Sequence, residues 1–258
     1  MTGPREIPPV MGRMLSLLRE PPGSPDVSEG FIDLLGDRAE GRRSIAQSLM
    51  RSRVIPEVYE RWWRPVLGQL AKAGGPSMAD EVDIAVAHLG LGPGDVVLDI
   101  ACGPGTFARR YAEVVGADGL VIGLDASTTM LQRAVRDTTA ENVGYLRGDA
   151  VDLPLATDSL DAVSCYAALH LFSEPFTALD RMTDVLAPGG RIALLTSCAR
   201  GPGLVREVSG LLAGVTGMRL FGADEVTGAL TVRGFTDVRQ RVSGVLQFVA
   251  GTLETAAA

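Results

Sequence analysis

Three aspartates and a glycine-rich turn have the residue types and the spacing that could hold a small molecule. Asp99 lies in the apolar run VVLDI, and the turn Ala-Cys-Gly-Pro-Gly follows it at residues 101–105. Asp125 and Asp149 each come at the end of a later apolar run. Glycines let the backbone of such a turn approach a ligand closely, and carboxylates accept strong hydrogen bonds from hydroxyl and amino groups. We therefore expect a ligand site built from one turn and several strand ends.

Two classes of ligand compete for the turn. Residues 103–108 fit the fingerprint of a dinucleotide-binding turn, and Asp125 stands where a ribose-binding acid is expected. Asp99 favours a different ligand, because its carboxylate would repel a pyrophosphate and attract a cation. Pro104 also removes a backbone N–H that a phosphate would use. The turn therefore indicates a cationic ligand, such as a sulfonium amino acid, rather than a dinucleotide.

The elements that position these residues follow from the pattern of the chain. From residue 95 onward, continuous apolar runs alternate with helical segments. Such an alternation is typical of a parallel sheet that is covered on both faces. Ligands of open α/β sheets bind at the carboxyl ends of the strands. The expected strands are residues 95–101, 120–126, 143–150, 160–169 and 191–197, and the expected helices between them are residues 106–115, 127–138 and 174–186.

Further elements are expected on either side of this core. Ser77, with Asp80 three residues later, predicts a capped helix that ends at Gly90. In the tail, Ser243 and Gly244 stand between two strand-like runs and predict a hairpin. Helices are also expected at about residues 203–220 and 224–233.

The composition limits the class of protein. The chain has 258 residues, of which 46% are hydrophobic and 21% are charged, as in ordinary soluble enzymes. A net charge of −7 argues against a nucleic-acid partner. No apolar run is long enough to cross a membrane, and the N-terminus lacks the pattern of a signal peptide, so we expect a cytoplasmic protein. Cys102, Cys165 and Cys198 form no CxxC pair, so we expect buried thiols and no metal site.

Four segments of the chain, in order, resemble class I S-adenosylmethionine-dependent methyltransferases. LDIACGPGTF is similar to their first motif, GLDAS to the acidic end of the second strand, GDAVDLPLATDSLDAV to the adenine-side segment and LAPGGRIAL to the entry of the fifth strand. The resemblance covers about residues 77–252. It implies an α/β fold with a Rossmann-like seven-stranded sheet, mostly parallel, with an antiparallel C-terminal hairpin. Ala101 departs from the longest form of the motif, which has glycine there.

The resemblance also implies a cofactor and the residues that hold it. The cofactor would be S-adenosyl-L-methionine, converted to S-adenosyl-L-homocysteine. Asp99 would orient its amino group, directly or through water, and Asp125 would accept hydrogen bonds from both ribose hydroxyls. Asp149 would accept a hydrogen bond from the adenine amino group. The full set of implied cofactor-binding residues is Asp99, Ala101, Cys102, Gly103, Gly105, Asp125, Ala126, Met130, Gly148, Asp149, Ala150 and Tyr166.

His170 is the candidate catalytic residue, because it follows the strand that ends beside the expected methyl group. A base is needed only if the acceptor must lose a proton. His170 is therefore interpreted either as a base or acceptor-positioning group, or as a packing residue of the pocket wall. Tyr166 is a weaker alternative, whose side chain could simply pack on the sheet.

Residues 1–76 are expected to be an N-terminal extension with a helical lid, and residues 77–258 the methyltransferase domain. Tyr59, Trp62 and Trp63 are spaced to share one helix face. Two interpretations stay open. This face docks the extension onto the core, or it is a lid that binds the acceptor together with His170.

The functional hypothesis is methyl transfer to a small acceptor. Two stretches, SRVIPEVYERWWRPVLGQL and CYAALHLFSEPFTALDRMTDVLAPGGRIAL, are similar to a bacterial and plastid group close to quinone methyltransferases. This narrower resemblance suggests an apolar or aromatic, quinone- or lipid-like acceptor. The alternatives are an NAD-linked oxidoreductase on a related fold and a non-catalytic cofactor-binding protein. We expect a monomer or homodimer that binds no nucleic acid and does not insert stably in a membrane, although arginines near the lid would allow weak association with its surface.

Overall fold

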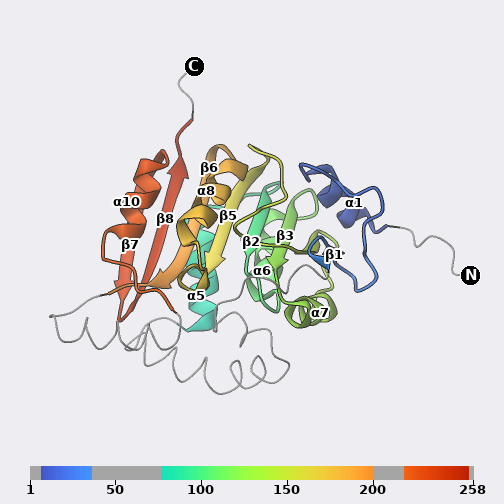
Figure 1. The fold of residues 1–258 in the computed structure, drawn as a ribbon, viewed down its shortest axis with the longest axis horizontal. Helices are drawn as coiled ribbons and strands as arrows, with labels where there is room; N and C mark the ends of the chain where they lie inside the picture. Colours follow the sequence, from blue (N-terminus) through green and yellow to red (C-terminus); the bar gives the residue numbers. More distant parts are fainter. Residues whose placement is uncertain (1–6, 37–76, 200–217, 256–258) are drawn as a thin grey trace, which may run out of the picture.

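The computed structural model describes residues 7–36, 77–199 and 218–255. These residues form a mixed α/β fold around one sheet of eight strands, in the order β1-β4-β3-β2-β5-β6-β8-β7 (Figure 1). The strands are β1 (Ile32–Asp33), β2 (Val96–Ile100), β3 (Leu120–Asp125), β4 (Val143–Arg147), β5 (Leu160–Tyr166), β6 (Leu186–Ser197), β7 (Phe235–Ser243) and β8 (Leu246–Leu253). The helices are α1 (Pro9–Ser16), α5 (Met78–Leu89), α6 (Thr106–Val115), α7 (Thr128–Asp137), α8 (Pro175–Val185) and α10 (Glu225–Val232), with a 3-10 turn at Leu169–Leu171.

The sheet has the predicted direction of strands. Strands β1 to β6 pair in parallel, and β8 pairs antiparallel with β6 and with β7. Strand β2 lies between β3 and β5, so the chain leaves β2 toward one side and later returns to its other side. Such a change of direction is where open α/β sheets bind ligands, outside the carboxyl ends of the strands. The glycine turn after β2 lies at this point.

Local sequence signals explain where several helices begin and end. The Ser77 hydroxyl accepts from the Asp80 backbone N–H at 3.3 Å, and the Asp80 carboxylate accepts from the Ser77 N–H at 2.8 Å. This capping box starts α5, and Gly90, with a φ of 54°, ends it. Both ends of this helix are confirmed. The Ser127 hydroxyl caps α7 by accepting from the Met130 N–H at 3.4 Å.

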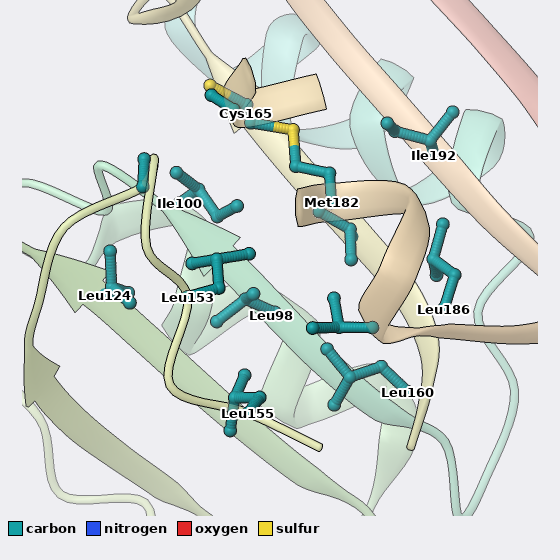
Figure 2. Packing of buried hydrophobic residues seen from close by; sticks show 14 of the residues in the cluster. Leu98, Ile100, Leu124, Leu153, Leu155, Leu160, Cys165, Met182, Leu186 and Ile192 are labelled. Carbon is teal, nitrogen blue, oxygen red and sulfur yellow. The ribbon is translucent and has the colours of Figure 1, made fainter. Parts of the chain in front are cut away.

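Helices cover both faces of the sheet and divide the core. On one face, leucine and isoleucine side chains of β2, β3 and β6 share one apolar cluster with α8, whose Met182 lies near Cys165 (Figure 2). On the other face, α5, α6 and α7 bury a second apolar cluster. Alternate residues of a strand point to opposite faces. Leu98 and Ile100 belong to the first cluster and Val97 to the second, so Asp99 faces the α5–α6 side.

One expectation needs correction. The sheet has eight strands among the described residues rather than seven, because β1 adds to the edge of β4. Ahead of β1, α1 forms at Pro9–Ser16 and buries Met11 and Met14. The expected hairpin and the helix near residues 224–233 are confirmed as β7, β8 and α10. The helix expected near residues 203–220 falls largely outside the described residues.

The added strand is held by an ion pair at the edge of the sheet. The Arg147 guanidinium lies 2.8 Å from the Asp33 carboxylate, and both side chains are largely buried. Arg147 also donates to the Ala126 carbonyl at 3.4 Å, and the Leu34 N–H donates to the Arg147 carbonyl at 3.1 Å. Part of the expected N-terminal extension is therefore joined to the end of β4, next to Ala126, which is predicted to flank the adenine.

Candidate cofactor site

The glycine turn after β2 packs tightly on the Tyr145 side chain at Gly105 and leaves open space at Gly103. Gly105 has a φ of 76°, and a Cβ there would overlap the Tyr145 side chain, whose Cζ would be 3.0 Å away. At Gly103, with a φ of 54°, a Cβ would meet nothing within 4 Å. Residue 105 must therefore be glycine, because the turn packs directly on the Tyr145 side chain there. A Cβ at Gly103 would meet only open space, and a ligand can occupy that space.

Ala101 occupies the same turn in a conformation that favours glycine. Its φ is 56°, in the left-handed region. A Cβ in that region costs about 1–2 kcal/mol. The departure from the glycine of the motif therefore carries a backbone cost. We have no physical account of why alanine stands there.

Asp125 links the turn to the end of β3. One oxygen of its carboxylate accepts from the Gly103 N–H at 2.9 Å and the other accepts from the Ser127 N–H at 2.8 Å. Its own carbonyl accepts from the Gly148 N–H at 3.2 Å. Each carboxylate oxygen has a further lone pair. Asp125 can therefore fix the turn and still accept hydrogen bonds from a ligand.

Asp99 lies deeper, under the turn. Its side chain is buried, with 2% exposed, and the Ser164 hydroxyl donates to Oδ1 at 2.7 Å. Oδ2 has no hydrogen-bond partner of normal geometry among the described residues. Burial raises the pKa of Asp99 to about 7, and the charge of Asp125 adds to the rise. A buried carboxylate oxygen without a donor is costly, so this atom is a ready acceptor for a cationic or N–H group.

The remaining predicted cofactor residues lie around the ends of β3, β4 and β5. Asp149 is exposed, and its carboxylate accepts from the Val151 N–H at 3.1 Å. Tyr166 ends β5, with its ring 4.8 Å from that of Phe107 and its hydroxyl buried without a hydrogen-bond partner among the described residues. Burial raises the pKa of Tyr166, so its phenol is neutral. Ala126 is half-buried, and the other members of this group are buried, namely Met130, Gly148 and Ala150.

All three cysteines are buried, as expected. Cys102 belongs to the turn, and burial raises the pKa of its thiol well above the ordinary value. It therefore contributes a neutral, apolar wall rather than a nucleophile. Within the described ranges, no three His, Cys, Asp or Glu side chains are placed to hold a metal ion.

His170 lies in the 3-10 turn after β5, at the predicted place in the chain. Its side chain is buried, and Nδ1 is 3.3 Å from the Thr196 hydroxyl. Burial lowers the pKa of His170 to about 4, so the imidazole is neutral near pH 7. A neutral imidazole can donate or accept one hydrogen bond, but its protonated form is disfavoured here. Tyr59, Trp62 and Trp63 lie outside the described residues.

Sequence reasoning missed three residues that support this site. Ser164 holds Asp99, Tyr145 lies under Gly105, and Glu81 of α5 is buried with its charge close to Tyr166. A signal existed for Ser164, because it is a small hydroxyl side chain within the strand-like run AVSCY. Tyr145 gave no comparable signal, since an aromatic residue in a strand is ordinary.

Relatives of the chain agree with the resemblance found in its motifs. A family model described as "Methyltransferase domain" matches residues 97–190. An uncharacterised chloroplastic methyltransferase of Arabidopsis thaliana is 32% identical over 155 residues, which are 57% of this chain and 43% of that protein. A 2-phytyl-1,4-naphtoquinone methyltransferase of Synechococcus elongatus is 40% identical over 116 residues, 43% of this chain and 50% of that protein. The chain thus spans about half the length of the curated relatives it matches.

A solved structure confirms the fold. Phosphoethanolamine N-methyltransferase 2 of Haemonchus contortus, in complex with phosphomonomethylethanolamine and S-adenosylhomocysteine, superposes with a TM-score of 0.65 at 16% identity. The match covers 83% of this chain and 61% of that one. At this identity the likeness shows the fold alone, and the family rests on the sequence matches. Residues 97–190 match the methyltransferase-domain family, and these sequence matches support the resemblance of the chain to class I S-adenosylmethionine-dependent methyltransferases.

Proposed function

We propose that the chain transfers the methyl group of S-adenosylmethionine to a small apolar or aromatic acceptor of the quinone or lipid-like kind. The observation that carries the cofactor assignment is the buried Asp99 carboxylate, whose Oδ2 has no hydrogen-bond partner among the described residues. The cofactor's ammonium group supplies the missing cation. A dinucleotide would instead bring a pyrophosphate toward this carboxylate and Asp125.

The proposed cofactor contacts follow the strand ends. The space above Gly103 receives the methionine part, between Asp99 and the turn. Asp125, which accepts from the Gly103 and Ser127 N–H groups, also accepts from the ribose hydroxyls. The exposed Asp149 carboxylate is available to the adenine amino group. The wall around the adenosine is assigned to Ala126, Met130, Gly148, Ala150 and Tyr166, and the wall around the methionine part to Ala101, Cys102 and Gly105.

The cofactor, when bound, supplies an electrophilic methyl group on its sulfonium. What remains for the chain is to orient the acceptor and exclude water. We assign His170 to this task, as a group that hydrogen-bonds the acceptor. Burial lowers its pKa to about 4, which makes it a poor base at neutral pH but leaves a neutral imidazole to donate or accept. Thr196 fixes the imidazole through Nδ1.

The acceptor class is supported by the Synechococcus elongatus relative, whose name specifies a phytyl-naphthoquinone substrate. An aromatic lid formed by Tyr59, Trp62 and Trp63 would suit such an acceptor. No helix among the described residues has the length and apolar character to span a bilayer. A cytoplasmic location, a monomeric or homodimeric state and the lack of a nucleic-acid partner stay predictions. Neither the oxidoreductase nor the non-catalytic alternative is favoured by the relatives, which are named as methyltransferases.

The cofactor assignment is tested by calorimetric titration of the whole chain with S-adenosylhomocysteine and, separately, with NADH. We expect binding of S-adenosylhomocysteine alone. Asp125→Ala should weaken it by about 1.5–3 kcal/mol, on the order of tenfold to a hundredfold, because the ribose loses charge-assisted hydrogen bonds. The same variant should melt lower, since the Gly103 and Ser127 N–H groups lose their acceptor. Binding of NADH instead, or an unchanged affinity in Asp125→Ala, would contradict the assignment.

The variant Asp99→Asn should stabilise the ligand-free protein and at the same time weaken ligand binding. The folded pKa of about 7 exceeds the ordinary value of 3.8, so between these values the folded state holds a proton that the unfolded state releases. Asp99 therefore lowers stability as the pH rises through that window, and the loss is complete above about pH 7. Asparagine keeps the shape and the acceptor for Ser164 without the charge.

The expected result, from melting curves of the ligand-free variant, is a rise of a few degrees above wild type near pH 8 that disappears near pH 4. The affinity for S-adenosylhomocysteine should fall at least about tenfold, because a charge-assisted hydrogen bond is lost. A variant that melts below wild type near pH 8 and binds the ligand normally would refute the role given to Asp99.

The lid is tested with the double variant Trp62→Ala, Trp63→Ala. If these side chains cover the acceptor, turnover of a naphthoquinone acceptor should be lost while cofactor affinity and melting temperature stay near wild type. If they dock the extension onto the core instead, the melting temperature should fall first, and the lid is then rejected.

A further inference from the structure

Besides Asp99 itself, a buried serine of β5, Ser164, is part of this site and holds the Asp99 carboxylate. Asp99 and Ser164 are directly paired in the register of β2 and β5. The Ser164 side chain is fully buried, and its hydroxyl donates to Asp99 Oδ1 at 2.7 Å. A serine hydroxyl has one proton to donate, and here that proton is committed to Asp99. The bond fixes one oxygen of the carboxylate against β5 and leaves the other for a ligand.

The surroundings of this pair are closed to water. Ser164 faces the same side of the sheet as Asp99, toward Tyr111 of α6, whose side chain is fully buried. Burial, followed by the charge of Asp99, raises the pKa of Tyr111, so the phenol stays neutral. The Asp99 side chain is itself 2% exposed. A donor lost at Ser164 cannot readily be replaced by solvent.

We propose that Ser164 is a positioning residue for the cofactor: it holds Oδ1 of Asp99 so that the charged carboxylate presents Oδ2 to the ammonium group of the cofactor's methionine part. The proposal rests on the proposed function, because it requires a ligand that carries an ammonium group at the glycine turn. It adds a role for Ser164, which touches Asp99 and acts on the ligand through it.

The charges around the pair explain why this hydroxyl matters. Among the described residues, the ionisable groups found to interact with Asp99 come from β3, β4, β5, α6 and the glycine turn, and they are acidic or neutral. They are Asp125 from β3, Cys102 from the turn, Tyr111 from α6, Tyr145 from β4, and Cys165 and Tyr166 from β5, with Glu81 of α5 next to Tyr166.

Two hydrogen-bond donors lower the pKa of Asp99. They are the Ser164 hydroxyl and, less strongly, the Ala108 N–H in the first turn of α6. Against burial and the charge of Asp125, they leave it at about 7. Removing the hydroxyl therefore raises this pKa further, and more of the ligand-free protein carries a proton on Asp99 at neutral pH.

The pKa of Asp99 determines how the affinity for an ammonium-bearing ligand changes with pH. An ammonium group binds the charged carboxylate, so below the pKa of Asp99 binding must displace a proton, and affinity falls by up to about tenfold per pH unit. In wild type this fall begins near pH 7. In Ser164→Ala it should begin at higher pH. The affinity at pH 7 should then be on the order of tenfold lower and should recover as the pH rises.

The experiment is calorimetric titration of the whole chain between about pH 6 and pH 9 with two ligands. S-adenosylhomocysteine carries the ammonium group, and 5′-methylthioadenosine lacks the amino-acid part. The variants are Ser164→Ala and Ser164→Thr, which keeps a hydroxyl. The matched control is Ser197→Ala, which removes another buried serine hydroxyl, one that contacts Arg219 and Phe221 rather than Asp99.

The proposal predicts that only Ser164→Ala moves the pH profile upward, and only for S-adenosylhomocysteine, while Ser164→Thr restores the wild-type profile. Equal weakening for both ligands at every pH would show a merely structural role and overturn the proposal. So would an unmoved profile in Ser164→Ala. If wild type binds neither ligand, the proposed function itself fails. Normal wild-type binding with an unmoved variant profile rejects the role of Ser164 alone.

Discussion

The Asp99 carboxylate is buried at the end of β2, where one side-chain donor, Ser164, holds one of its oxygens. Protein interiors admit a charged group only when it is paired or well hydrogen-bonded. Ser164 meets part of that requirement at Oδ1, and Oδ2 is left to a ligand. Burial, together with the charge of Asp125, raises the pKa of the Asp99 carboxyl to about 7. Perturbed acids of this kind gather at functional sites, where stability is given up for binding.

The rest of the site depends on keeping that carboxylate beside an open turn. Tyr145 sits under Gly105 and sets the depth of the turn, and Asp125 ties the Gly103 N–H to the end of β3. Strand β4 contributes Tyr145, and its end is held in turn by the Arg147–Asp33 ion pair with β1. The order of the strands therefore brings three separate parts of the chain to one candidate site.

The sequence predicted the fold well because the strands are continuous apolar runs and the helix ends carry strong signals such as Ser77 and Gly90. Helix α6 begins and ends at the expected residues. Strand β1 could not be predicted, since two residues show no periodicity and its pairing depends on Arg147, far along the chain. The link between Ser164 and Asp99 depends on the register of β2 against β5, which periodicity does not fix. The burial of His170 is likewise set by tertiary packing around it.

The central claim is that the buried oxygen of Asp99 receives the ammonium group of the cofactor. A crystal structure of the whole chain with S-adenosylhomocysteine tests it most directly. The account predicts the ligand's amino nitrogen within about 3.2 Å of Asp99 Oδ2, or one bridging water between them, with the Ser164 bond to Oδ1 retained. A ligand bound elsewhere, or bound at the turn with its ammonium group turned away and Oδ2 still lacking a donor, would contradict it.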